Sequence, residues 1–314
     1  MTPTVQDVDR FEAARPRLEA IAYRLLGSAS EAEDAVQDTY LRWQAADTGR
    51  IEVPEAWLTK VLTNLCLNQL TSARVRRETY VGAWLPEPLL AGDAMLGPAD
   101  TAEQRESVSY AVLTLMERLT PSERAVYVLR EAFGYPHREI AEILDIGESA
   151  AQQVYHRAKK HIADGRTRSR VDEAAARRVI EEFLLAAAGG RTEPLVELLT
   201  SDAISIGDGG GKVPARAKAF EGAKAVATFM RGLLKPGKAK TAFTGGSVEL
   251  HMTDANGSTA VVAVVGGRVI GVMCVEVTSD GIHAFRNQVN PDKLERATRQ
   301  WAAMEHGKPL LTAF

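Results

Sequence analysis

One short stretch of the chain places amide and cationic side chains at helical spacing. In residues 148–162 the apolar positions recur on one side of an expected helix, and polar positions occupy the other side. The polar positions are Gln152, Gln153, His156, Arg157, Lys159 and Lys160. Amide groups can read base edges and cations neutralise phosphates, so this face has the chemistry of a DNA-binding surface. A solvated amphipathic hairpin is the alternative, because charged outer faces are common on helices.

The residues before this stretch supply the elements that would position it. Val126, Leu129 and Phe133 recur at helical spacing, and a second helix is expected at about 137–144. The turn Asp145-Ile146-Gly147 follows, and we expect Ile146 to anchor it from inside. Two helices joined by a short turn that contains Gly predict a helix-turn-helix, whose second helix enters the major groove.

The composition is that of a globular chain with several domains. The sequence has 314 residues, of which 45% are hydrophobic and 25% charged, with a formal net charge of −3. Six Lys/Arg against one Asp fall in residues 154–170, so a local basic patch is expected despite that net charge. No apolar run is long enough to span a membrane, and the first residues contain no apolar stretch of the kind found in secretion signals, so we do not expect secretion. Cys66 and Cys274 lie in apolar runs, as small core residues of a reducing compartment do, so we expect a cytoplasmic location.

Residues 7–75 are expected to be helical throughout. An acidic helix near residues 31–43 is followed by one that begins at Pro54 and ends in a basic tail. Lys60, Asn64 and Asn68 share one surface of the second helix.

The order of an AEDAVQDTYLRW helix, a WLTKVLTNLCLNQL helix, a linker and a helix-turn-helix resembles an extracytoplasmic-function sigma factor of the sigma-70 family. The resemblance covers residues 7–168. It implies region 2 at 7–75, a linker at 76–101 and region 4 at 102–168, and hence a factor that brings core RNA polymerase to specific promoters. The partners it implies are promoter DNA and the β′ clamp helices and β flap of core polymerase.

The same resemblance assigns roles to residues. The polymerase-binding candidates are Asp34, Gln37, Asp38, Leu41 and Trp43. Those for melting and capturing the −10 element are Lys60, Asn64, Asn68, Arg74, Arg76 and Arg77. The polar face of the helix-turn-helix would read the −35 element. Gln152 stands where Arg is expected from similar members, so the −35 preference is expected to differ.

The linker contains a WLPEPL segment that resembles a signature of sigma factors with an extra C-terminal domain. Trp84, Leu85 and Leu89 are costly to leave in water, so we expect them to dock on a neighbouring surface. Helices expected at 171–188 and 194–199 precede strands expected at 241–250, 258–265, 269–277 and 282–289. This order predicts an α+β domain at 171–290, which resembles a SnoaL-like domain of the NTF2-like cone fold, and a tail at 291–314. The whole chain is therefore expected to be multidomain, with two all-α domains before the α+β domain.

Two motifs in this last domain, DGGGK and NPDKL, also resemble signatures of that subgroup. Together with the linker tryptophan they are expected to regulate activity in cis, with Lys212 on a flexible loop beside another domain. The regulatory candidates are Trp84, Asp208, Gly209, Gly210, Gly211, Lys212, Asn290, Pro291, Asp292, Lys293 and Leu294.

No catalytic motif, cofactor motif or metal-ligand spacing stands out, so neither an enzyme nor a cofactor is expected. A small-molecule ligand in the C-terminal domain is left open. One alternative function is a ligand-responsive helix-turn-helix regulator that acts without polymerase. Another is a cyclase-like enzyme with a DNA-binding appendage.

Overall fold

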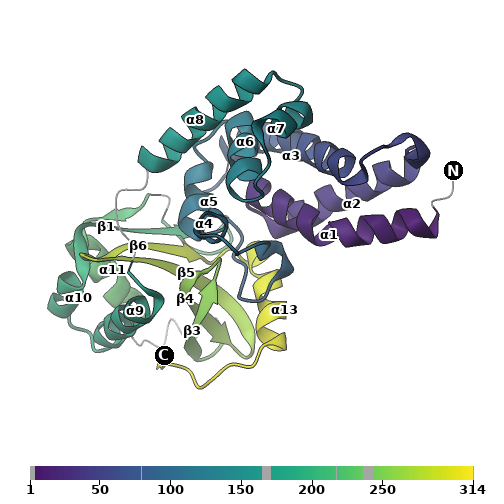
Figure 1. Cartoon of the computed structure of the whole chain (residues 1–314). Coiled ribbons are helices and arrows are strands. Elements are labelled where there is room, and N and C mark those ends of the chain that lie inside the picture. Colours follow the sequence, from purple (N-terminus) through teal and green to yellow (C-terminus); the bar gives the residue numbers. More distant parts are fainter. Residues whose placement is uncertain (1–3, 79, 165–170, 217, 236–243, 314) are drawn as a thin grey trace. The chain divides into compact units, whose positions relative to one another are not determined.

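The chain folds into two compact units in the computed structural model (Figure 1). The structure describes residues 4–78, 80–164, 171–216, 218–235 and 244–313, with the side chains of residues 73–78, 102, 164 and 313 left out. The helical unit comprises residues 1–79 and 92–167, and the mixed unit comprises residues 80–91 and 168–314. No helix among the described residues is both long and apolar enough to cross a membrane.

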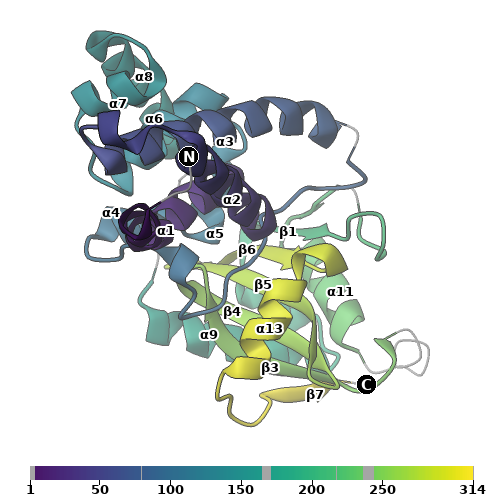
Figure 2. The same ribbon diagram turned by 90° about the vertical axis from the view of Figure 1, so that its right-hand side faces the viewer.

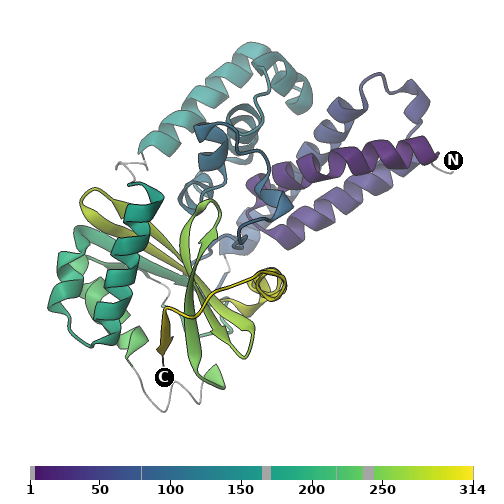
Figure 3. The same ribbon diagram turned by 60° about the horizontal axis from the view of Figure 1, so that its bottom comes forward.

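The helical unit begins with α1 (Val5–Leu26), α2 (Ala29–Ala45) and α3 (Pro54–Glu78), which pack side by side (Figure 3). The one-turn helix η1 (Thr48–Arg50) lies between α2 and α3. Thr4 and Asp7 form a capping box at the start of α1, and Gly27 ends that helix in the left-handed conformation. One apolar stripe, fully buried at Phe11 and Ile21, joins α1 to the other two helices.

The rest of the helical unit is made of shorter helices. They are η2 (Ala94–Leu96), α4 (Ala102–Ser107), α5 (Tyr110–Met116), α6 (Pro121–Glu131), α7 (His137–Leu144) and α8 (Glu148–Asp164). The helix-turn-helix of α7 and α8 is present as expected. The expectation for Ile146 is wrong: its side chain is 38% exposed. Asp145 adopts a left-handed φ of 53°, which lets the Ile146 backbone N–H bond to the Ala141 carbonyl and holds the turn through the backbone.

Two buried arginines hold the early and late helices of this unit together. The Arg24 guanidinium donates to Ser107 Oγ at 3.0 Å and to the Leu96 carbonyl at 2.6 Å. Arg124 Nη1 lies 2.5 Å from a Glu117 carboxylate oxygen, and its Nε donates to the Arg24 carbonyl. Burial lowers the pKa of Arg24 to about 10 and that of Arg124 to about 9. Both therefore remain charged at neutral pH, and their hydrogen bonds fix α1 against α4 and α6.

The mixed unit is one curved sheet with helices on both faces. Its helices are α9 (Glu173–Ala188), α10 (Glu193–Glu197), α11 (Ala223–Leu234), the one-turn η3 (Pro291–Lys293) and α13 (Glu295–Ala303). Its strands are β1 (Leu199–Asp208), β2 (Phe220–Glu221), β3 (Val248–Ala255), β4 (Ser258–Val265), β5 (Arg268–Thr278), β6 (Gly281–Gln288) and β7 (Leu311–Ala313).

The sheet has the strand order β2-β1-β6-β5-β4-β3-β7. Strands β3 to β6 form an antiparallel meander, with Gly266-Gly267 in a turn of positive φ, and β1 pairs with β6 in parallel. Figure 2 shows α13 on one side of the strands and α9 and α11 on the other. On the α9/α11 side, Phe183 of α9 packs on Phe285 of β6 with ring centroids 5.0 Å apart. This is the expected α+β architecture; β1 and α11 were not among the expected elements.

Residues 80–91, here called the docked segment, lie in the mixed unit, while residues 92–101 belong to the helical unit. The expected linker is therefore divided, and residues 76–78 continue α3. Leu85 and Leu89 are fully buried, as their apolar character predicted. The segment also pairs with the end of β3 through the Ala91 N–H to the Asp254 carbonyl and the Asn256 N–H to the Leu89 carbonyl.

Candidate functional site

The polar face of α8 is exposed along its whole length. Gln152, Gln153, His156, Arg157, Lys159 and Lys160 are all exposed. At about 100° per residue they cover roughly half of the helix circumference. Ala151, Ala158 and Ile162 are buried on the other side, against α6. The helix-turn-helix thus presents a continuous polar and cationic face to solvent.

The cations on α8 are only weakly held by neighbouring acids. Arg157 Nε lies 3.8 Å from a Glu123 carboxylate oxygen, and Lys159 Nζ lies 3.9 Å from Glu131. The hydrogen bond from Lys159 to the Tyr155 hydroxyl, together with Glu131, raises the pKa of Lys159. The two cations are exposed although the acids are largely buried, and at 3.8–3.9 Å the pairs are long, so both cations can exchange these acids for phosphates.

The α3 surface expected to meet the −10 element is partly covered within the helical unit. Lys60 Nζ lies 2.5 Å from Asp145 Oδ1 and donates to the Glu142 carbonyl at 2.9 Å. Asn64 is half-buried, and Asn68 is exposed. The side chains of Arg74, Arg76 and Arg77 lie outside the described residues. One of the expected −10 contacts is thus bonded to the turn of the helix-turn-helix.

The acidic face of α2 contains four of the five expected polymerase contacts. Asp34, Gln37, Asp38 and Leu41 are exposed, and the Leu41 side chain is 54% exposed. A single exposed leucine is common on protein surfaces, so this exposure makes Leu41 accessible but does not by itself mark an interface. The expectation for Trp43 is wrong: its indole is 1% exposed, donates to the Asp7 carbonyl at 2.9 Å and packs on Trp57. It is a core residue because it lies on the side of α2 that faces α1 and α3.

The fully buried Asp208 carboxylate binds the docked segment to the mixed unit. It accepts hydrogen bonds from the Tyr80 hydroxyl at 2.7 Å, the Leu85 N–H at 2.9 Å and Lys293 Nζ at 2.8 Å. It also accepts from the Gly210 N–H and from Gln288 Nε2. Such a buried charge is tolerated only when it is paired and fully hydrogen-bonded, as it is here. We call Asp208, Gln288, Asn290, Lys293 and the docked-segment atoms bonded to them the clasp.

Lys293 and Tyr80 make further contacts within the clasp. Lys293 Nζ lies 4.2 Å from the Trp84 ring centroid and donates to the Leu85 carbonyl at 2.7 Å. The Tyr80 hydroxyl accepts a hydrogen bond from Asn290 Nδ2 at 3.0 Å. Burial, followed by the bond to Asp208, raises the pKa of the Tyr80 phenol, so it acts as a donor.

The glycines after Asp208 let its loop approach the NPDKL motif closely. Gly210 has a φ of 59°, and a Cβ built there would lie 2.3 Å from Asn290 Nδ2. Lys212 Nζ lies 2.6 Å from Asp292 Oδ1. The expected flexible loop is instead a tight turn, closed by the Lys212 and Val213 N–H groups on the Gly209 carbonyl, and Lys212 contacts its own unit. The regulatory candidates at Trp84, 208–212 and 290–294 are therefore gathered around the docked segment.

Sequence reasoning missed several residues of this cluster. Gln288 is fully buried, and its amide donates to the carbonyls of Leu85 and Pro86. Asn256, also fully buried, accepts from the Leu89 N–H at 3.1 Å and has a left-handed φ of 52°. The Asn256-Gly257 pair is a turn signal, but nothing local in the sequence connects it to a segment 167 residues away.

The described residues hold no group of three or more His, Cys, Asp or Glu able to bind a metal. Burial raises the pKa of the Cys274 thiol to about 12, and it also raises that of Cys66. Both thiols are consequently protonated at neutral pH and poor nucleophiles.

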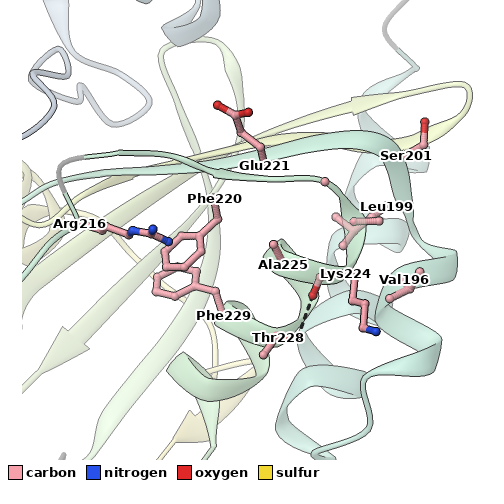
Figure 4. A pocket seen from close by; sticks show the side chains of 12 residues that line it. Val196, Leu199, Ser201, Arg216, Phe220, Glu221, Lys224, Ala225, Thr228 and Phe229 are labelled. Atoms are coloured by element: carbon pink, nitrogen blue, oxygen red, sulfur yellow. Dashed lines mark hydrogen bonds between the residues drawn. The ribbon is translucent and has the colours of Figure 1, made fainter.

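An open hollow of about 1000 Å³ lies beside β2 and α11 (Figure 4). Phe220 and Phe229 stack there with ring centroids 4.2 Å apart, and the Arg216 guanidinium lies 4.8 Å from the Phe220 ring. The labelled side chains do not converge on one point, so we assign no site to this hollow.

Comparison with known proteins identifies the family of the chain. Residues 10–76 match the family Sigma-70 region 2, and residues 109–162 match Sigma-70, region 4. The sigma factor SigJ of Mycobacterium tuberculosis is 39% identical over 230 residues, which cover 73% of each chain. The probable sigma factor SigI of the same organism is 36% identical over 194 residues, 60% of this chain and 65% of that one.

The crystal structure of M. tuberculosis SigJ aligns with a TM-score of 0.69 and 32% identity, covering 91% of this chain and 97% of that one. The similarity therefore extends over both units, and the resemblance found in the sequence is confirmed. The family is not a class of enzymes. The chain belongs to the extracytoplasmic-function RNA polymerase sigma factors, which bind core polymerase and direct transcription from specific promoters.

Proposed function

We propose that the exposed face of α8 reads the −35 element, the Lys60–Asn68 surface of α3 captures the −10 strand, and the acidic face of α2 docks on the β′ clamp helices. Region 4 would contact the β flap, and the protein would act in the cytoplasm with its polymerase. Exposure supports the first and third assignments, because Gln152, Arg157, Asp38 and Leu41 are all accessible. A melted strand is bound through stacking and cations, and Lys60 supplies a cation on this surface of α3.

The helical unit would have to open before it binds a promoter. The −10 and −35 elements lie about 25 base pairs apart, which is about 85 Å of duplex at about 3.4 Å per base pair. Lys60 is bonded to Asp145 and Glu142, and the Thr59 and Tyr135 hydroxyls lie 3.2 Å apart, so α3 and α7 are in direct contact. One helical unit cannot hold these contacts and span both elements, so the packed unit would be a resting form.

The mixed unit would regulate this opening in cis by holding the docked segment. A free segment of 12 residues (80–91) can span any distance up to about 40 Å at about 3.3 Å per residue. Once Asp208 and Lys293 hold Tyr80 and Leu85, and Asn256 and Asp254 hold Leu89 and Ala91, both ends of the segment are fixed. The clasp would thereby limit how far the residues before Tyr80 and after Ala91 can separate. The observation that carries this proposal is the fully buried Asp208 carboxylate with its five donors.

Run-off transcription with bacterial core polymerase tests the proposal on a template carrying the gene's own upstream region. The full-length protein would be compared with Lys293→Met and with Lys308→Met, which removes an exposed cation outside the clasp. We expect Lys293→Met to change the transcript yield and Lys308→Met to leave it unchanged. Equal yields from all three proteins would reject regulation by the clasp, and no transcript from any of them would reject the promoter assignments.

A further inference from the structure

The mixed unit contains a cavity of about 450 Å³ on the α9/α11 side of its sheet. Leu234 at the end of α11, Leu250 of β3, Val261 of β4 and Met273 of β5 form part of its wall, which is mostly aliphatic. This volume is in the range of small-molecule sites, and an aliphatic wall favours a ligand with an apolar body.

One polar group in the wall lacks a partner. Asn287 Nδ2 donates to the Ile206 carbonyl and to Ser205 Oγ, both at 3.2 Å. A carbonyl only accepts, so this contact fixes which end of the amide is nitrogen. Asn287 Oδ1 is buried and has no hydrogen-bond partner among the described residues. A buried acceptor without a donor is unfavourable, so a ligand that donates a hydrogen bond here would be stabilised.

The second polar group is a cation. Arg268, at the start of β5, lines the cavity, has an exposed side chain and makes no ion pair with any described residue. Met273 pairs with Asn287 across β5 and β6, and Arg268 precedes Met273 by five residues along β5. At about 3.3 Å per residue, the backbones of Arg268 and Met273 lie roughly 16 Å apart along β5. The Arg268 side chain can reach part of this distance, so its guanidinium can lie closer than that to Asn287.

We propose that the cavity binds an aliphatic carboxylic acid of about ten carbons with a hydroxyl at its far end. The chain fills the apolar cavity, the hydroxyl donates to Asn287 Oδ1, and the carboxylate pairs with the Arg268 guanidinium. The aliphatic wall, the unpartnered acceptor and the unpaired cation each account for one part of this ligand.

The proposal deepens the proposed function and rests on it, because the cavity and the clasp share two segments of chain. Pro291 and Leu294 line the cavity, while Asn290 and Lys293 of the same turn bind the docked segment. On β6, Asn287 faces the cavity, and the next residue, Gln288, faces the docked segment on the other side of the sheet. A ligand that fixes this wall stabilises the clasped state, and by linkage the clasped state binds the ligand more tightly.

Titration calorimetry of the full-length protein with 10-hydroxydecanoic acid, decanoic acid and decan-1-ol tests the site. We expect the hydroxy acid to bind most tightly, and each compound lacking one polar group to bind about tenfold more weakly. Arg268→Met should weaken binding of the hydroxy acid about tenfold but leave binding of decan-1-ol unchanged. Arg299→Met, which removes an exposed cation outside the cavity, should not affect binding of either compound. Ala263→Phe, which fills the cavity, should abolish binding. No binding of the hydroxy acid, or unchanged binding to Ala263→Phe, would overturn the site.

Limited chymotrypsin cleavage after Trp84, read by mass spectrometry, tests the coupling. We expect saturating hydroxy acid to slow this cleavage severalfold in the unmodified protein and to have no effect in Ala263→Phe. Binding without any change in cleavage would overturn the coupling. If Lys293→Met changes transcription but no acid binds, the ligand inference fails and the proposed function stands.

Discussion

Lys293 Nζ lies 2.8 Å from Asp208 Oδ2, and this ion pair joins two motifs that are 85 residues apart in the sequence. The Asp208 side chain is fully buried, and that of Lys293 is 13% exposed. Burying such a pair costs desolvation free energy, so its two charges depend on each other.

Removing one partner is therefore expected to be more harmful than removing both. Lys293→Met should lower the free energy of unfolding by about 3–5 kcal/mol, because it leaves the Asp208 carboxylate buried without a cation. Asp208→Asn combined with Lys293→Met should recover part of that loss. Urea unfolding followed by tryptophan fluorescence measures both values. A double variant as unstable as the sum of the single variants would show that the pair is not coupled.

Gly210→Ala should destabilise the mixed unit more than Gly190→Ala does. Both glycines have positive φ, at 59° and 76°, so alanine costs about 1–2 kcal/mol of backbone strain at either position. Only at Gly210 would the added Cβ also clash with the Asn290 amide, which adds about 1–3 kcal/mol. Urea unfolding of the two variants isolates the steric term, and equal losses would contradict close packing of the two motifs.

Arg157→Ala is expected to weaken promoter binding and flatten its salt dependence. Each phosphate contact contributes about −0.9 to the slope of log K against log salt, so the slope should change by about that amount. Arg138→Ala serves as the control, because Arg138 is an exposed cation of α7 paired with Glu142. Fluorescence anisotropy of polymerase holoenzyme on a labelled promoter measures the slope at several salt concentrations. An unaltered slope for Arg157→Ala would mean that this side chain does not touch the DNA backbone.

Asp145→Asn should modestly increase the rate of open-complex formation. It removes the charge that holds Lys60 and keeps a residue type that tolerates the left-handed turn. The Lys60 and Asp145 side chains are 39% and 71% exposed, so the pair contributes at most about 1 kcal/mol, or about fivefold in rate. Asp47→Asn breaks an exposed pair with Arg50 away from the α3–α7 contact and should have no effect. A slower rate for Asp145→Asn would argue against the packed unit as a resting form.

The stability of the helix-turn-helix should depend on pH through His137. Burial, followed by Arg130 and His156, lowers the pKa of His137 below its ordinary value of 6.5, and Glu148 opposes this weakly. The unfolded chain then binds the proton more readily than the folded chain does. The contribution of neutral His137 to the free energy of unfolding is therefore present above about pH 6.5 and is lost as the pH falls through the lowered pKa. His137→Gln should remove the dependence. Thermal unfolding between pH 7.5 and 5 measures it, and parallel curves for the two proteins would rule out this role of His137.

The elements that sequence reasoning found are those with local signals. The helix at residues 137–144 and the strand at 258–265 have the expected bounds, because apolar periodicity is interrupted by Gly147 and by Gly266-Gly267. Strand β1 was missed because SDAISIGD is half polar, and its parallel partner β6 lies about eighty residues later. Helix α11 was missed as well, although its apolar face packs in the core of the mixed unit.

The candidate surfaces were likewise predicted where the signal is local and missed where it depends on distant residues. Helical spacing alone was enough to place the six α8 residues on one exposed face. Trp43 was misassigned, because a family motif names a position but does not show which side of α2 faces the core. Tyr80 and Gln288 were not predicted as part of the clasp. They bond to Asp208 over sequence separations of 128 and 80 residues, and no local sequence pattern indicates such contacts.

The separation of Leu85 from Lys293 has a consequence for the order of synthesis. The two residues are 208 positions apart, so at about 5–20 residues per second a ribosome needs about 10–40 s to add Lys293 after Leu85. During that interval both DNA-binding regions have been made, and the group that holds their connection does not yet exist. Each newly synthesised chain is therefore unclasped until Lys293 has been added. A messenger truncated before the codon for Lys293 would give a protein that cannot form the clasp.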